Sequence, residues 1–289
     1  MPALFRALRP HQWVKNVLLF VPLVTAHRVL DAQAWADAAR AFAAMCFMAA
    51  AAYVANDLVD LDADRAHPTK RFRPFASGEL AVWIGFALLP ILATAALLIA
   101  ITLPVAFVEW LGIYGALALL YSFWFKRFAL VDVTILALLY SLRLLAGAAA
   151  IAVPVSAWLI AFSVFFFFSL ALAKRHAEIR ASRELEGGPQ RIRGYRPSDL
   201  ETVAIFGIAS GYLSVLVMAL YTDSREIAHL YTHPIWLWGF SPLLLLWVSR
   251  LWLYAARGQL QEDPVLFATK DWSTYAVLIG LGACMYFAT

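Results

Sequence analysis

Apolar segments, each close to twenty residues long, recur along the whole sequence. A helix of about twenty apolar residues crosses the hydrocarbon core of a bilayer. The composition agrees, because 63% of the 289 residues are hydrophobic and only 15% are charged. About a quarter of the residues are charged in an ordinary soluble domain. The sequence therefore predicts an all-α, polytopic membrane protein.

Nine transmembrane helices are expected from these segments, at about 13–30, 36–58, 82–102, 105–125, 130–152, 155–174, 199–221, 234–256 and 272–288. No hydrophilic stretch between them is long enough to fold by itself, so residues 1–289 are expected to form a single transmembrane domain. The longer loops fall at about 57–81, 174–198 and 257–271. Loops that a rigid scaffold holds often carry function.

Positive charge is concentrated on one side of the predicted bundle. The N-terminal segment and the three longer loops hold most of the Lys and Arg residues, whereas the opposite loops hold little beyond Arg28 and Arg225. The positive-inside rule then predicts an N-in, C-out protein of the inner (plasma) membrane whose longer loops face the cytoplasm. The net charge of +4 favours membrane lipids or phosphorylated substrates as partners and argues against nucleic acid.

An acidic cluster follows the second apolar segment. Asp57, Asp60 and Asp64 have a spacing that a continuing helix would place on one face. Carboxylates so placed repel one another unless a cation lies among them, and Mg²⁺ takes one or two carboxylates together with substrate phosphates. A solvated acidic helix end is the alternative, but charge beside an apolar span is costly and usually functional. The pattern predicts a metal–diphosphate site, for Mg²⁺ or Mn²⁺.

A basic stretch directly follows the acidic one. Lys70, Arg71 and Arg73 lie in a segment that Pro68 and Pro74 should hold as a loop rather than a helix. The guanidinium group of Arg matches phosphate oxygens bidentately, and Lys adds a point charge. Ordinary positive-inside charge explains some of these residues but not their position beside carboxylates. The stretch therefore predicts phosphate binding.

Other charged residues lie inside or at the ends of apolar segments. Arg143 is in the middle of one, where an unpaired guanidinium is expensive, so it is expected to face the bundle interior and pair with a carboxylate or a substrate phosphate. Lys15 lies one turn into the first segment, where it either reaches the interface or enters the site. Tyr121 and Lys126 end the fourth segment, and Lys174 has the spacing of a helical ion pair with Glu178.

These residues together resemble the UbiA superfamily of intramembrane prenyltransferases. The string Asn56-Asp57-x-x-Asp60-x-x-x-Asp64 is similar to the first Asp-rich motif of that superfamily, and the nine-span pattern agrees with it. The resemblance implies a UbiA-type helical bundle. It also implies that Asp57, Asp60 and Asp64 act in catalysis by holding Mg²⁺ on a diphosphate, with Asn56 assisting.

More narrowly, the chain resembles the decaprenyl-phosphate phosphoribosyltransferase branch. The matching pieces are Arg9-Pro-His-Gln-Trp-Val-Lys15-Asn16, the run from Asp64 to Pro74, Leu142-Arg143-x-x-Ala146-Gly147, Lys174-Arg175-x-x-Glu178 and the segment from Arg257 to Ala268. Typical aromatic prenyltransferases of the superfamily carry a second Asp-rich motif where this chain has Lys174, Arg175 and Glu178. One acidic and one basic cluster suit two anionic substrates, one bound through metal and one directly by cations.

The resemblance implies transfer of 5-phosphoribosyl from 5-phosphoribosyl diphosphate to a polyprenyl phosphate, with release of pyrophosphate. Lys126 and the basic stretch at 70–73 would bind the ribosyl donor near Tyr121. The lipid phosphate would contact Lys174 and Arg175, and Lys15 and Arg143 would add positive charge. A homo-oligomer, with a trimer as the expected form, is also implied.

Two other functions are open to a chain with this pattern. A UbiA-type enzyme that moves a prenyl group from its diphosphate to an aromatic or quinone precursor would be expected to carry the second acidic motif. A membrane transporter would place its charges near the bilayer midplane, whereas most charges here cluster at one predicted face. The sequence favours the phosphoribosyl transfer.

Overall fold

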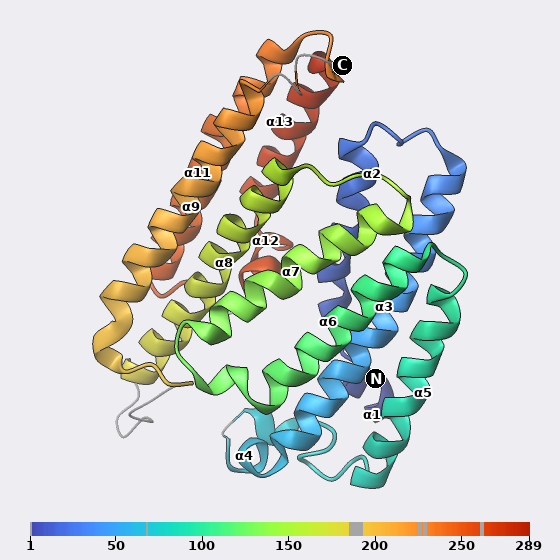
Figure 1. The fold of residues 1–289 in the computed structure, drawn as a ribbon. Helices are drawn as coiled ribbons and strands as arrows, with labels where there is room; N and C mark the ends of the chain where they lie inside the picture. Colours follow the sequence, from blue (N-terminus) through green and yellow to red (C-terminus); the bar gives the residue numbers. More distant parts are fainter. Residues whose placement is uncertain (1, 68, 185–192, 225–226, 228–229, 261–262) are drawn as a thin grey trace. The chain divides into compact units, whose positions relative to one another are not determined.

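The computed structural model describes residues 2–67, 69–184, 193–224, 227, 230–260 and 263–289. The regular elements in these residues are helices, which confirms the predicted all-α class (Figure 1). Seven of them are long and apolar enough to cross a membrane. The last helix, α13 (Trp272–Ala288), is apolar but shorter. The first predicted span is a 3₁₀ helix, η1 (Pro10–Phe20), followed by the short helix α2 (Val21–Thr25). The count of nine spans stays a prediction.

The chain divides into two compact units. The first comprises residues 1–126 and 139–155, and the second comprises residues 127–138 and 156–289. Helix α7 (Val131–Ala150) therefore contributes its first part to the second unit and its last part to the first. The expectation of a single transmembrane domain stays a prediction.

The first unit is built around α3 (Ala32–Val59). Asp31 caps this helix by accepting a hydrogen bond from the Ala34 amide at 3.0 Å. The other elements are α1 (Ala3–Leu8), η1, α2, α4 (Leu61–Ala66), η2 (Lys70–Phe72), α5 (Val82–Ala100) and α6 (Val105–Phe123). Helix α3 packs against α5, α6, η1 and α1. Its buried face consists largely of alanine, and small residues let membrane helices approach closely.

The second unit is built around α8 (Ala157–Glu184), which packs against α9 (Leu200–Thr222) and α11 (Phe240–Ala256). The smaller elements are η4 (Pro197–Asp199), η5 (Pro234–Gly239) and α12 (Pro264–Ala268). Ser169 of α8 donates a hydrogen bond to the Gly207 carbonyl at 2.7 Å and accepts one from the Trp252 indole at 3.0 Å. A single hydroxyl thus joins three helices.

Two of the predicted loops begin with helical residues in the structure. The loop placed at 174–198 begins later, because α8 continues to Glu184 and so contains Lys174 and Arg175. Residues 185–192 of that loop lie outside the described residues. The loop placed at 57–81 begins at Asp60, because α3 runs to Val59, and it contains the short helix α4. In α8 the helix continues past the apolar run, since charged residues such as Lys, Arg and Glu are good helix formers.

Candidate active site

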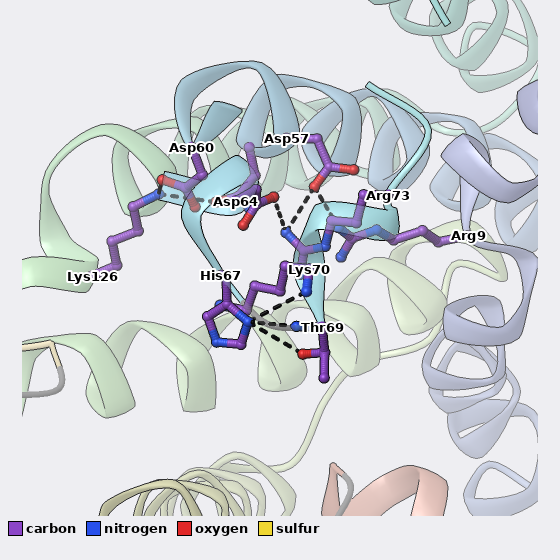
Figure 2. A network of polar contacts seen from close by, with 10 residues as sticks. Arg9, Asp57, Asp60, Asp64, His67, Thr69, Lys70, Arg73 and Lys126 are labelled. Carbon is purple, nitrogen blue, oxygen red and sulfur yellow. Dashed lines mark hydrogen bonds and ion pairs between the residues drawn. The ribbon is translucent and has the colours of Figure 1, made fainter. Parts of the chain in front are cut away.

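The predicted carboxylates lie around the junction of α3 and α4 (Figure 2). Asp57 is in the last turn of α3, Asp60 is the residue between the two helices, and Asp64 is in α4. The Asp60 amide still donates to the Asn56 carbonyl at 2.9 Å, and the Asp64 amide donates to the Asp60 carbonyl at 2.7 Å. The chain therefore bends but keeps helix-like spacing. Asp57 and Asp64 are buried, and Asp60 is partly exposed.

Each carboxylate contacts a cation. The Nη1 atom of Arg73 lies 3.3 Å from Asp57 Oδ1 and 2.5 Å from Asp64 Oδ2, so one guanidinium bridges both buried acids. The ammonium group of Lys126 lies 2.5 Å from Asp60 Oδ1 and 3.2 Å from Asn56 Oδ1. These contacts join residues that are up to 70 positions apart in the sequence. The structure thus brings together six of the predicted site residues: Asn56, Asp57, Asp60, Asp64, Arg73 and Lys126.

Arg9 belongs to the same cluster, although from the sequence it was only the start of a matching motif and had no predicted role in the site. Its guanidinium pairs with Asp57 and lies 5.3 Å from the centre of the Tyr53 ring. The backbone of Arg9 has a φ of 51°, a left-handed conformation that ends α1 just before Pro10 begins η1. Burial lowers the pKa of Arg9, and the charge of Asp57 opposes that effect. We define these residues as the carboxylate cluster: Arg9, Asn56, Asp57, Asp60, Asp64, Arg73 and Lys126.

The carboxylate cluster contains carboxylate oxygens of the kind that bind Mg²⁺, but the side chains of Arg9, Arg73 and Lys126 lie among them. Among the residues that the structure describes, no three acidic, His or Cys side chains are grouped to hold a metal. One oxygen is nevertheless left over, since Asp57 Oδ2 is buried and has no hydrogen-bond partner. The available donors are carboxylate oxygens, which Mg²⁺ prefers, and Mg²⁺ usually binds together with substrate phosphates. The set therefore fits a divalent metal ion that binds together with a diphosphate.

The basic stretch is shaped by His67. The Nδ1 atom of His67 accepts from the backbone amides of Thr69 at 3.2 Å and Lys70 at 3.3 Å, which folds the chain back after α4 (Figure 2). Burial, with the charge of Lys70 adding to it, lowers the pKa of His67. Arg71 is exposed and its guanidinium lies 4.9 Å from the centre of the Phe72 ring. Pro68 lies outside the described residues.

Arg143 is buried inside the first unit, as predicted, but its partners are neutral. It donates to Asn16 Oδ1 at 2.8 Å, to the Leu139 carbonyl at 2.6 Å and to the Tyr114 hydroxyl at 2.8 Å. Lys15 is also buried, and its ammonium lies 5.6 Å from the centre of the Tyr140 ring, which Arg143 contacts as well. No ion pair joins Arg143 to a carboxylate within the described part of the chain, so the predicted carboxylate partner is absent there. Tyr121 is half-buried near the end of α6.

The predicted basic pair lies in the second unit, and its two members differ. Lys174 is partly exposed and lies 3.1 Å from Asp263 Oδ2. Arg175 is fully buried, with Nη2 at 2.6 Å from Asp132 Oδ2 and a second ion pair to Glu178. The predicted pair of Lys174 with Glu178 is therefore not the one observed, because Glu178 contacts Arg175. The sequence pattern had not assigned roles to Asp132 and Asp263.

Comparison with known proteins gives a consistent result. The model of the UbiA prenyltransferase family matches residues 18–274. Protein y4nM of Sinorhizobium fredii is 39% identical over 93% of this chain, which spans about half (52%) of that protein. Nodulation protein NoeC of Azorhizobium caulinodans is 35% identical over 97% of this chain and 91% of its own length. The decaprenyl-phosphate phosphoribosyltransferase of Mycolicibacterium smegmatis is 36% identical over 78% of this chain and 72% of its own length.

The fold is also that of a solved structure. A UbiA homologue from Archaeoglobus fulgidus, bound to DMAPP and Mg²⁺, superposes with a TM-score of 0.74 over 99% of both chains at 17% identity. The family match covers most of the chain, and the predicted resemblance is confirmed. This chain belongs to the UbiA prenyltransferase family and is a multi-pass membrane enzyme of the prenyl-type transferases.

Proposed function

We propose that this enzyme transfers 5-phosphoribosyl from 5-phosphoribosyl diphosphate to a polyprenyl phosphate of the decaprenyl type, releasing pyrophosphate. The observation that carries the proposal is the charge-matched carboxylate cluster, combined with Lys174 and Arg175 at the place of a second acidic motif. The likeness to a decaprenyl-phosphate phosphoribosyltransferase supports it. This chain spans only about half (52%) of y4nM, and the name of NoeC states no substrate, so neither relative favours a particular substrate.

In the proposed reaction, an oxygen of the lipid phosphate forms a bond to the anomeric carbon of the ribose. The bond from that carbon to the diphosphate oxygen breaks, and the electron pair leaves with pyrophosphate. A phosphate monoester is already an anion at neutral pH, so the reaction needs no general base, and we assign none. Charge builds up on the leaving diphosphate, and stabilisation of that charge is where electrostatic catalysis is most effective.

Each residue of the donor site has a role in this proposal. Asp57, Asp60 and Asp64 would hold Mg²⁺, with Asn56 assisting, and the bound metal would neutralise charge on the leaving group. Arg73 and Lys126, which now neutralise the carboxylates, would turn to the phosphates of the donor. Three further cations would complete the binding of the two substrates: Lys70 and Arg71 at the donor, and Lys174 at the lipid phosphate.

Lys15 and Arg143 supply positive charge inside the first unit. In the described part of the chain, Arg143 donates hydrogen bonds to neutral groups and forms no ion pair with a carboxylate. We propose that Lys15 and Arg143 favour the approach of an anionic substrate to that unit. The positive-inside pattern supports an inner-membrane location with the site facing the cytoplasm, where a soluble sugar diphosphate is reached directly. The trimeric state stays a prediction.

The proposal is tested with purified full-length protein in detergent or proteoliposomes. One reaction receives ribose-labelled 5-phosphoribosyl diphosphate and a polyprenyl phosphate, and a parallel reaction receives a labelled prenyl diphosphate and an aromatic acceptor. Both are run with Mg²⁺ and after chelation by EDTA. We expect lipid-linked ribose label in the first reaction, only with metal, and no prenylated aromatic product in the second. Turnover of the prenyl diphosphate alone would instead assign the chain to the aromatic prenyltransferases.

A further inference from the structure

The buried ion pair of Arg175 raises a question about the predicted lipid-phosphate site. Arg175 and Lys174 are consecutive in α8, so their side chains project about 100° apart around the helix axis. Arg175 is fully buried and points to Asp132 of α7, whereas Lys174 is partly exposed. A guanidinium enclosed in this way does not meet a substrate from solvent or membrane. Only one of the two predicted cations is open to a ligand.

The surroundings of Arg175 form a buried polar network. The Tyr195 hydroxyl donates to Asp132 Oδ1 at 2.8 Å and accepts from the Leu130 amide at 2.8 Å. Asp132 Oδ2 faces Arg175 and forms a buried ion pair with it, although the two groups lack hydrogen-bond geometry. The Arg175 guanidinium also lies 5.7 Å from the centre of the Tyr195 ring. Burial and the charge of Asp132 raise the pKa of Tyr195, so its hydroxyl stays a donor.

The backbone around this network is tightly packed and unusual. Gly194 has a φ of +84°, and a Cβ atom there would lie 2.7 Å from the Arg127 carbonyl oxygen and 2.9 Å from the Ala129 amide nitrogen. Leu130 and Arg193 also have positive φ, at 65° and 50°. Non-glycine residues are held in this region only where the surroundings over-determine them. The turn at 193–195 is therefore pressed against the segment 127–130.

We propose that Asp132, Arg175 and Tyr195 form a positioning joint, and that Lys174 is the member of the basic pair that meets the lipid phosphate. The joint ties the start of α7, the part of α8 around Lys174 and the turn at 193–195 to one another, and so holds Lys174 in a fixed direction. This inference rests on the proposed function for the identity of the lipid substrate. The joint itself rests on the contacts within the second unit.

The joint is tested without any assay of activity by hydrogen exchange of the full-length protein. Tyr195→Phe removes the acceptor of the Leu130 amide, so exchange in a peptide covering 127–138 should become faster. Tyr212→Phe is the matched control, because Tyr212 lies 3.0 Å from Ser249 on the exposed side of α9 and should leave that peptide unchanged. Equal exchange in wild type and Tyr195→Phe would overturn the joint.

The role of Lys174 is tested by a double-mutant cycle with a short-chain polyprenyl phosphate as substrate. Tyr195→Phe should raise the KM for this lipid about three- to tenfold, the range expected if Lys174 loses about one net hydrogen bond to the lipid phosphate, while the KM for the soluble donor stays constant. In the Lys174→Gln background the same change should have an effect below about twofold, because coupled residues are not additive.

Additive effects would show that Tyr195 does not act through Lys174 and would overturn the positioning role. A rise in KM confined to Arg175→Lys, with Lys174→Gln silent, would overturn the assignment of Lys174. If the protein turns over a prenyl diphosphate and no ribosyl donor, the proposed function fails. The cycle is then run with that prenyl diphosphate, and the exchange result still decides whether the joint exists.

Discussion

Gly147 provides a sharp test of how the first unit is packed. This residue lies on α7, one helical turn after Arg143, and faces the backbone of η1. A Cβ atom at this position would meet the carbonyl oxygen of Leu19 and lie 2.8 Å from its carbonyl carbon and from its Cα. Because these are backbone atoms, no change of rotamer relieves the overlap. Gly147→Ala must therefore move η1 away from α7.

Two effects of opposite sign set the magnitude. Alanine is a better helix former than glycine by about 1 kcal/mol. Insertion of a methyl group into a closely packed site costs about 1–3 kcal/mol, and contact with backbone places this position at the upper end. The net destabilisation is then about 1–2 kcal/mol, which corresponds to a fall in Tm of about 2–8 °C. The shift should also weaken the hydrogen bond from Arg143 to Asn16, since Asn16 lies on η1.

The assay is thermal unfolding of the purified protein in detergent. Gly112→Ala is the control, because Gly112 lies in α6 of the same unit and a Cβ atom there has no neighbour within 4 Å. We expect the Tm of Gly112→Ala to equal or slightly exceed that of wild type. Equal Tm values for Gly147→Ala and Gly112→Ala would refute the contact between α7 and η1.

Three further predictions follow from the contacts described. Arg73→Met should lower the Tm, because it leaves two buried carboxylates without their shared cation. Arg71→Met should instead raise the KM for the donor and leave the Tm unchanged. Equal Tm values for the two variants would contradict this. Protonation of His67 removes the acceptor of two amides, and its pKa is lowered in the fold. The turn at 67–70 should therefore be fully formed above about pH 6.5 and should be lost as the pH falls below that value. Hydrogen exchange of residues 69–73 measures this. Exchange that does not depend on pH, after correction for the intrinsic rates, would contradict it. Ser169→Ala should destabilise the protein by about 1–3 kcal/mol, measured by urea unfolding in detergent. A change below about 0.5 kcal/mol, the lower limit for one net hydrogen bond, would exclude the role of this hydroxyl.

The acidic part of the site could be predicted because its signal is local. Asp57, Asp60 and Asp64 are close in sequence, and their position beside an apolar helix already marks them as costly. Lys126 could be predicted as a residue type, but its contact with Asp60 depends on the packing of α3 against α6. The two residues are 66 positions apart, and a single sequence gives no local pattern that indicates a contact over this separation.

Arg9 and Arg175 show what local patterns miss. Arg9 reaches Asp57 because its own left-handed backbone conformation turns the chain between α1 and η1, and the hydrophobic periodicity of the sequence does not predict that turn. Arg175 is adjacent to Lys174 and carries the same charge, so composition treats them alike. Their difference arises because α8 continues past the apolar run and turns one side chain inward to Asp132.

The most direct test of the proposed reaction follows both halves of the donor at once. Wild-type protein and Asp57→Asn are incubated with Mg²⁺, a polyprenyl phosphate and 5-phosphoribosyl diphosphate that carries ¹⁴C in the ribose and ³²P in the β-phosphate. We expect wild type to transfer ¹⁴C to the lipid and to release ³²P as pyrophosphate in equal molar amounts, and Asp57→Asn to do neither. Lipid that carries ³²P, or an Asp57→Asn protein as active as wild type, would contradict the proposed reaction.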